Sequence, residues 1–283
     1  MSDWSAWIGR EERRTDTLDP ALAARWLATF DRAAPADGTL PQGIHWCLCT
    51  PDAPTAMLGA DGHPQRDESE DSFFPPIPLP RRMWASSEVE FLAPLAPGDA
   101  IERVSSIDSI AEKEGRSGKL AFVTVAHETA ANGVAAVREK QHLVYREAAA
   151  PDAPLVPPEG DGVGFDGSAW DVVRELTPRP PLLFRYSALT FNTHRIHYDA
   201  PYARGVERYR GLVVHGPLMA SLLLDLAAQE LGPNAVTRFA FRAVSPAIAG
   251  DKLLLAMKRE GEDFTLGVFA TDGRQVVRAE AAL

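Results

Sequence analysis

The sequence predicts an α+β protein that contains two tandem copies of one unit, each with a curved antiparallel sheet around a central helix. Two observations support this prediction. The turns and strands that begin near residue 89 recur near residue 239, and a repeat of this kind indicates the architecture. The run from Leu218 to Ala227 is apolar on nearly every face, so a helix there must be surrounded by other elements.

Length and composition are compatible with this architecture. The chain has 283 residues, of which 45% are hydrophobic and 24% are charged. This is the composition of an ordinary globular protein with enough apolar material for a core, and it excludes a disordered chain, a collagen and a coiled coil. The length alone fits either two domains or one large barrel.

The first predicted helix begins after Asp19. Asp19 is a capping residue, Pro20 suits the first helical position, and residues 21–33 space their apolar side chains three or four apart. Pro35 and Gly38 follow the apolar pattern and indicate where the helix ends. We expect this helix to act, more loosely, as the central helix of the first copy.

Two segments lack a periodic apolar pattern and divide the chain. Residues 51–80 are rich in Pro, Asp, Gly and Ser, which predicts an exposed loop that leads into an extended strand. Residues 148–167 are similar and form the best domain boundary. We therefore expect an N-terminal repeat over residues 1–147, a linker over 148–167 and a C-terminal repeat over 168–283.

Turn residues align the two copies with each other. Each copy contains a strand, a Gly-Asp turn, a long strand, an Asn-Gly or Asp-Gly hairpin and a final strand. The aligned pairs are Pro94 with Pro246, Gly98 with Gly250, and Gly133 with Gly273. The alternative is that two unrelated antiparallel sheets share generic turn chemistry. A curved sheet around a helix is a hot-dog fold, so the sequence predicts a double hot-dog.

Charge and cysteine content restrict the partners and the compartment. The formal net charge of -10 repels nucleic acid and anionic membrane surfaces, so we expect neither as a partner. The N-terminus has no signal-peptide pattern, and no apolar run is long enough to span a bilayer. Cys47 and Cys49 are spaced for neither a long-loop disulfide nor a usual zinc site, which favours a reducing, cytoplasmic location.

Residues 184–219 contain three of the seven histidines. This segment resembles the active-site region of MaoC-like (R)-specific enoyl-CoA hydratases. Their motif runs Ser/Thr-Gly-Asp-x-Asn-Pro-Ile-His-x-Asp and continues into Tyr-Ala and Val-His-Gly. Ile196-His197 matches the Ile-His of the motif, whereas Asn192 stands at its Asp position and His194-Arg195 replaces its Asn-Pro.

The variant FNTHRIHYD with GLVVHGPL, together with PLPRRMWAS at residues 78–86, resembles a narrower group, the hydroxyacyl-thioester dehydratases and itaconyl-CoA or mesaconyl-C4-CoA hydratases. The resemblance implies reversible hydration of a small branched dicarboxylic enoyl-CoA, in which coenzyme A is part of the substrate and no cofactor is needed. The alternatives are an (R)-3-hydroxyacyl-thioester dehydratase of fatty-acid type and a non-catalytic acyl-CoA-binding protein.

Hydration of an enoyl thioester requires a base for the water, an acid for the α-carbon and donors for the enolate oxygen. We assign the acid/base role to His197, which otherwise would only fix a loop. Asn192 can orient a water but is not a competent base, and its alternative role is that of an Asx-turn residue. Gly216 begins the central helix, where its backbone N–H can hold the thioester oxygen.

Four further residues are candidates for substrate binding. His215 is expected to line the pocket, while the guanidinium groups of Arg195 and Arg82 match a carboxylate or a phosphate in geometry. His194 adjoins Arg195 and is assigned with it. A solvated side chain is the alternative for Arg195 and Arg82, and Arg81 shares both interpretations with Arg82. A packed structural histidine is the alternative for His215.

No metal site is expected. His194 and His197 with Asp199 lack a cysteine or a third histidine that would complete a ligand set, and Asp199 precedes Pro201 in the manner of a helix N-cap. The first copy lacks the histidine motif. We therefore expect one active site per chain, in the C-terminal repeat. The N-terminal repeat is expected to hold the acyl or pantetheine chain. We also expect a homodimer.

Overall fold

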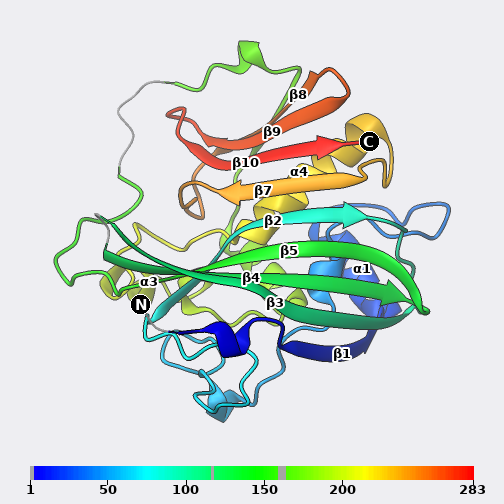
Figure 1. The fold of residues 1–283 in the computed structure, drawn as a ribbon. Helices are drawn as coiled ribbons and strands as arrows, with labels where there is room; N and C mark the ends of the chain where they lie inside the picture. Colours follow the sequence, from blue (N-terminus) through cyan, green and yellow to red (C-terminus); the bar gives the residue numbers. More distant parts are fainter. Residues whose placement is uncertain (1–2, 116–117, 159–163) are drawn as a thin grey trace.

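The computed structural model describes residues 3–115, 118–158 and 164–283. Its main feature is a ten-stranded antiparallel sheet in the order β1-β3-β4-β5-β2-β7-β10-β9-β8-β6, which curves along the molecule (Figure 1). The strands are β1 Glu11–Thr17, β2 Arg81–Phe91, β3 Ala100–Gly115, β4 Gly118–Ala131, β5 Val134–Arg146, β6 Val172–Leu176, β7 Arg238–Ala243, β8 Leu253–Glu260, β9 Asp263–Ala270 and β10 Gln275–Ala282. The α-helices are α1 Pro20–Thr29, α2 Pro180–Leu189, α3 Ala200–Gly205 and α4 Gly216–Leu231.

The sheet consists of two halves with the same strand order. Counted from its edge, the first half runs β1-β3-β4-β5-β2 and the second runs β6-β8-β9-β10-β7, and β2 pairs antiparallel with β7 where they meet. The registers also agree, because Phe91 pairs with Val137 in the first half and Ala243 pairs with Val277 in the second. The predicted duplication and the double hot-dog fold are therefore confirmed.

Helix α4 is the central helix, as the apolar run predicts. Leu218, Leu223 and Ala220 are fully buried, and the helix packs against β8, β9 and β10. Gly232 ends it with φ +105, a backbone conformation that favours glycine. Figure 1 shows α4 behind the strands of the second half.

The N-terminal helix does not act as a central helix, so that expectation was wrong. Helix α1 follows its edge strand β1 as α2 follows β6, and the two helices pack against each other. Each also begins at a proline, Pro20 and Pro180. The place that α4 takes after α2 is occupied in the first half by a 3₁₀ turn, Ile44–Cys47. The helical pattern identified α1, but it could not tell which helix of the unit α1 represents.

Helix α1 is capped as predicted but is shorter than its pattern. The Asp19 carboxylate accepts the N–H groups of Ala21 and Leu22 at 2.7 and 3.2 Å. The helix ends at Thr29, and Asp31 takes a left-handed φ of +53. A left-handed residue cannot continue a right-handed helix, so the apolar spacing beyond Thr29 is not helical.

The segment 51–80 contains no strand among its residues, as predicted, but it is not simply an exposed loop. Ile77 and Leu79 are buried in a second apolar cluster with Val125 of β4 and Tyr145 of β5. The segment therefore covers one face of the first half of the sheet. An earlier turn of the same segment reaches the second half of the chain.

This turn, residues 59–63, docks on the segment that carries the histidine motif. The Thr193 hydroxyl donates to Gly62 O at 2.5 Å, and the Arg195 N–H donates to Asp61 O at 2.8 Å. Gly62 has φ +89, and a Cβ placed on it would lie 2.0 Å from Thr193 O. Only glycine fits this close approach of two backbones.

The predicted linker includes residues 159–163, which lie outside the described residues, and the domain boundaries stay a prediction. Among the residues that the structure describes, no helix is long and apolar enough to cross a membrane.

Candidate active site

His197 lies in a 3₁₀ turn, Arg195–His197, between α2 and α3. The turn is fixed on both sides. The N–H of Val213 donates to Ile196 O at 2.9 Å, and Asp199 accepts the Tyr202 N–H at 3.0 Å as the N-cap of α3. The predicted capping role of Asp199 is therefore confirmed.

The hydrogen bond of His197 determines its tautomer. Its Nδ1 lies 2.7 Å from the carbonyl oxygen of Val213, and a carbonyl only accepts, so Nδ1 carries the proton and Nε2 keeps its lone pair. The side chain is buried, with 7% of the residue exposed. Burial lowers the pKa of His197 to about 4, and the charge of His63 acts in the same direction. The hydrogen bond to Val213 raises the pKa but does not offset burial. At neutral pH, Nε2 is therefore available as a base.

His215 supports the ring of His197. The two rings stack with centroids 3.5 Å apart and an interplanar angle of 18°. His215 Nε2 lies 2.8 Å from the Ser187 hydroxyl, while its buried Nδ1 has no hydrogen-bond partner among the described residues. Burial, followed by the charges of His197 and His194, lowers the pKa of His215 well below the usual range. The ring is therefore neutral.

His194 extends this pair into a row of four imidazoles. Its ring centroid lies 5.5 Å from that of His197 and 4.1 Å from that of His63. Burial lowers the pKa of His194 to about 2, and the charges of His63 and His197 contribute to the shift. His63 comes from the docked turn, so the N-terminal half of the chain contributes to this site.

A carboxylate ends the row. Asp61 Oδ2 accepts a hydrogen bond from His63 Nδ1 at 2.8 Å. Burial raises the pKa of Asp61, but the hydrogen bond and the charge of His63 outweigh it and bring the value to about 2. Sequence reasoning missed both residues, because nothing in a loop rich in Asp, Gly and Pro relates them to a histidine motif 131 residues away.

Asn192 follows helix α2, and Gly216 begins helix α4. The Asn192 side-chain oxygen accepts the His194 N–H at 2.9 Å, which is the Asx-turn geometry of the alternative interpretation. Gly216 is the first residue of α4, where backbone N–H groups have no partner within the helix. A Cβ on Gly216 would lie 3.9 Å from Trp84 O of β2. The catalytic role of Asn192 and the oxyanion role of Gly216 stay predictions.

The arginines differ in how fully they are engaged. Arg195 donates to Asp199 Oδ2 at 2.7 and 3.0 Å and to Ala60 O at 2.8 Å, so it connects the docked turn to the cap of α3. Arg81 is buried in an ion pair with Glu207. The guanidinium of Arg82 lies 5.7 Å from the centroid of the Phe74 ring. Substrate binding by Arg195 and Arg82 stays a prediction.

Asp61, His63 and His194 each present a potential ligand atom within 4.8 Å of the others. Two imidazoles and a carboxylate are suitable donors for a divalent metal. However, Nδ1 of His63 is already bonded to Asp61, and the two rings lie against each other. We interpret the group as a hydrogen-bonded pair beside a neutral imidazole, and the absence of a metal stays a prediction.

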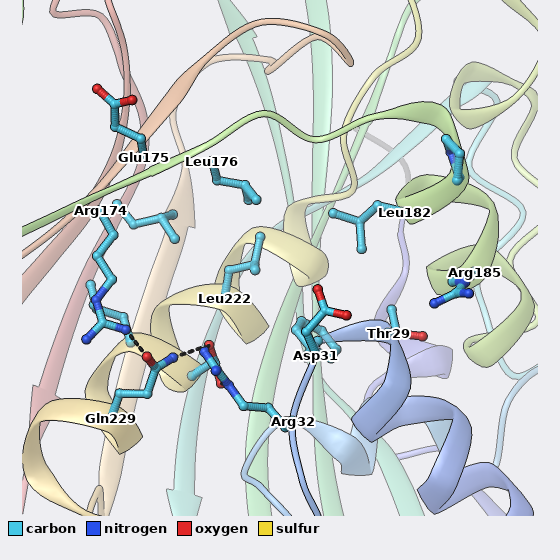
Figure 2. A pocket seen from close by; sticks show the side chains of 15 residues that line it. Thr29, Asp31, Arg32, Arg174, Glu175, Leu176, Leu182, Arg185, Leu222 and Gln229 are labelled. Atoms are coloured by element: carbon cyan, nitrogen blue, oxygen red, sulfur yellow. Dashed lines mark hydrogen bonds and ion pairs between the residues drawn. The ribbon is translucent and has the colours of Figure 1, made fainter.

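A separate cavity of about 390 Å³ lies between the end of α1, helix α2, helix α4 and strand β6 (Figure 2). It lies further along α4 than His215, since its lining includes Leu222 and Gln229. Its Arg32 is bonded to Asp225 at 2.6 Å. No histidine lines this cavity, so it is distinct from the histidine site.

The duplicated hot-dog sheet is the fold of solved MaoC-like dehydratases. A solved MaoC-like dehydratase shares the fold with a TM-score of 0.71 and 16% identity, over 99% of this chain and 98% of that one. A conserved hypothetical protein from Mycobacterium tuberculosis with a double hotdog fold gives a TM-score of 0.57 and 15% identity, over 98% of this chain and 96% of that one.

Sequence comparison identifies the family. Residues 43–249 match hydroxyacyl-thioester dehydratase type 2. The whole chain is 41% identical to the mesaconyl-C(4)-CoA hydratase of Chloroflexus aurantiacus, 98% of which is covered. A 99-residue stretch is 38% identical to the mitochondrial hydroxyacyl-thioester dehydratase type 2 of Schizosaccharomyces pombe, over 34% of this chain and 32% of that protein. The chain belongs to the hydroxyacyl-thioester dehydratase family, whose members are hydro-lyases.

Proposed function

We propose that this protein reversibly adds water to the double bond of an α,β-unsaturated acyl-CoA. The observation that carries the proposal is the state of His197, a buried neutral imidazole whose Nδ1–H is held by Val213 O and whose Nε2 is unprotonated. The acyl group that we propose is small, branched and dicarboxylic, of the mesaconyl-C4 or itaconyl type. Identity of 41% to a mesaconyl-C(4)-CoA hydratase supports that choice.

The geometry supports the following chemistry in the hydration direction. His197 Nε2 takes a proton from water as the water oxygen attacks the β-carbon. The electrons of the double bond move toward the thioester carbonyl, whose oxygen becomes negative. The N–H of Gly216, in the first turn of α4, and the positive end of the α4 dipole stabilise that oxygen. A proton is then delivered to the α-carbon.

Arg82 is the better placed of the two candidate arginines for the anionic groups of coenzyme A. Arg195 is held by Asp199 and Ala60, whereas the guanidinium of Arg82 lies over the Phe74 ring. Burial lowers the pKa of Arg66, and the charge of Arg82 acts in the same direction, against the raising effect of Tyr145. We propose that Arg82 helps to offset the net charge of -10 where the CoA phosphates bind.

A comparison of substrates tests the function. Purified protein is incubated with mesaconyl-C4-CoA, itaconyl-CoA and crotonyl-CoA, and loss of the enoyl-thioester absorbance is followed. We expect the dicarboxylic substrates to react fastest. A preference for crotonyl-CoA and longer unbranched chains would favour the fatty-acid-type dehydratase. No reaction, with a raised Tm in the presence of acyl-CoA, would favour the binding protein.

We also propose that the reaction needs neither an organic cofactor nor a metal, so that dialysis against a chelator leaves the rate unchanged. Cys47 and Cys49 are free and buried, which supports the proposed cytoplasmic location. The proposed homodimer is tested by light scattering coupled to size-exclusion chromatography.

A further inference from the structure

We infer that His63, oriented by Asp61, is a second acid/base residue of this active site and that it delivers the proton to the α-carbon. The inference rests on the proposed function, since it assigns a residue to one step of that reaction. It also assigns the N-terminal half a catalytic part beyond holding the acyl chain.

His63 is fixed at the site. The turn that carries it is bonded to the catalytic segment by Thr193 and Arg195, and Gly62 allows the backbone contact. The Asp61 carboxylate holds the ring of His63 through Nδ1. The same carboxylate also fixes the turn, because its Oδ1 accepts the backbone N–H of His63 at 3.0 Å. Such double support is what a positioned catalytic side chain requires.

His63 lies one ring away from His197. The centroids of His63 and His194 are 4.1 Å apart, and those of His194 and His197 are 5.5 Å apart. The His63 side chain retains 22% exposure, so it can exchange protons with solvent, whereas His197 is buried. His63 is therefore the more accessible of the two imidazoles, and the ring of His194 lies between it and His197.

Hydration needs a proton donor as well as a base. His197 is neutral, and its single proton is bound to Val213 O. His194 is neutral, and Asn192 is an amide whose oxygen is engaged with the His194 N–H. Of the four imidazoles, His63 is the one whose Nδ1 is bonded to a carboxylate, and a carboxylate at Nδ1 orients an imidazole for proton transfer through Nε2.

The proton balance is complete with these two residues. Water gives its oxygen to the β-carbon and one proton to His197 Nε2, and the enolate that forms takes the Nε2 proton of His63 to make the α C–H bond. His63 is then neutral and His197 is positive. Transfer of one proton from His197 to His63, through water, restores the starting state.

The test compares kcat for mesaconyl-C4-CoA in wild type, His63→Ala, His63→Gln and a control, His142→Ala. His142 lies on β5 and is bonded to Thr124, outside the site. We expect kcat to fall at least about 100-fold in both His63 variants, with little change in KM, since general acid catalysis contributes 10²- to 10⁴-fold. Added imidazole should restore part of the rate in His63→Ala, and His142→Ala should keep the wild-type rate.

Other outcomes overturn the inference. An active wild type with more than a third of its kcat left in both His63 variants would contradict it and leave the proposed function intact. A loss that imidazole does not rescue and that accompanies a lowered Tm would show a structural role. One bound metal per wild-type chain, lost in His63→Ala, would assign the group to metal binding. A wild type inactive on every enoyl-CoA would reject both proposals.

Discussion

At the scale of single residues, the site depends on histidines that are kept neutral. His197 and His215 are buried and stacked, and their pKa values are lowered chiefly by burial. The sequence motif identified both residues, because the family pattern is local. Asp61 and His63 could not be found in this way, because their partners Arg195 and His194 lie far along the chain and are reached only through folding.

Asn192→Asp is a test at this scale. A carboxylate can still accept the His194 N–H, so the turn is expected to remain. A negative charge here would repel a dicarboxylic acyl group. We expect kcat/KM for mesaconyl-C4-CoA to fall at least about 10-fold, which corresponds to a loss of about 1.4 kcal/mol of transition-state stabilisation. The fall for crotonyl-CoA should be smaller. A higher rate with mesaconyl-C4-CoA would instead show that the family carboxylate was merely replaced.

At the scale of elements, the repeat and helix α4 were predictable, because turn residues and apolar periodicity are local signals. The equivalence of α1 with α2 was not, since two helices with similar patterns differ only in what they pack against. The docked turn was also missed. A single glycine in a loop gives no sign that another backbone lies against it, yet Gly62 has no room for a Cβ beside Thr193.

Gly62→Ala tests the docked turn. The Cβ would lie 2.0 Å from Thr193 O, so the turn has to move and His63 moves with it. Gly98→Ala is the matched control, because Gly98 has a similar φ of +96 but no atom within 4 Å of its Cβ position. We expect at least about a 10-fold loss of kcat, roughly 1.4 kcal/mol, in the first variant and none in the second. Equal kcat values in the two would show that the turn has no catalytic importance.

At the scale of the whole molecule, buried neutral histidines make stability depend on pH. The pKa of His197 is about 4 in the folded protein, against an ordinary value of 6.5. Between these values the unfolded chain binds more protons, so stability falls as the pH falls. From pH 7 to pH 5, His197 alone corresponds to roughly 2 kcal/mol of lost unfolding free energy, and His194 and His215 shift in the same direction.

Urea unfolding at pH 7 and pH 5 measures this effect. The lowered pKa of Asp61, about 2, lies below this range, so that carboxylate contributes little to the difference. An unfolding free energy that is the same at both pH values would contradict burial of neutral imidazoles.

The most direct measurement is the loss of enoyl-thioester absorbance from mesaconyl-C4-CoA with wild-type protein and with His197→Ala. We predict turnover by the wild type and a fall in kcat of at least about 100-fold in the variant, which should remain folded by circular dichroism. More than a tenth of the wild-type kcat in folded His197→Ala would contradict the role of His197 as the base.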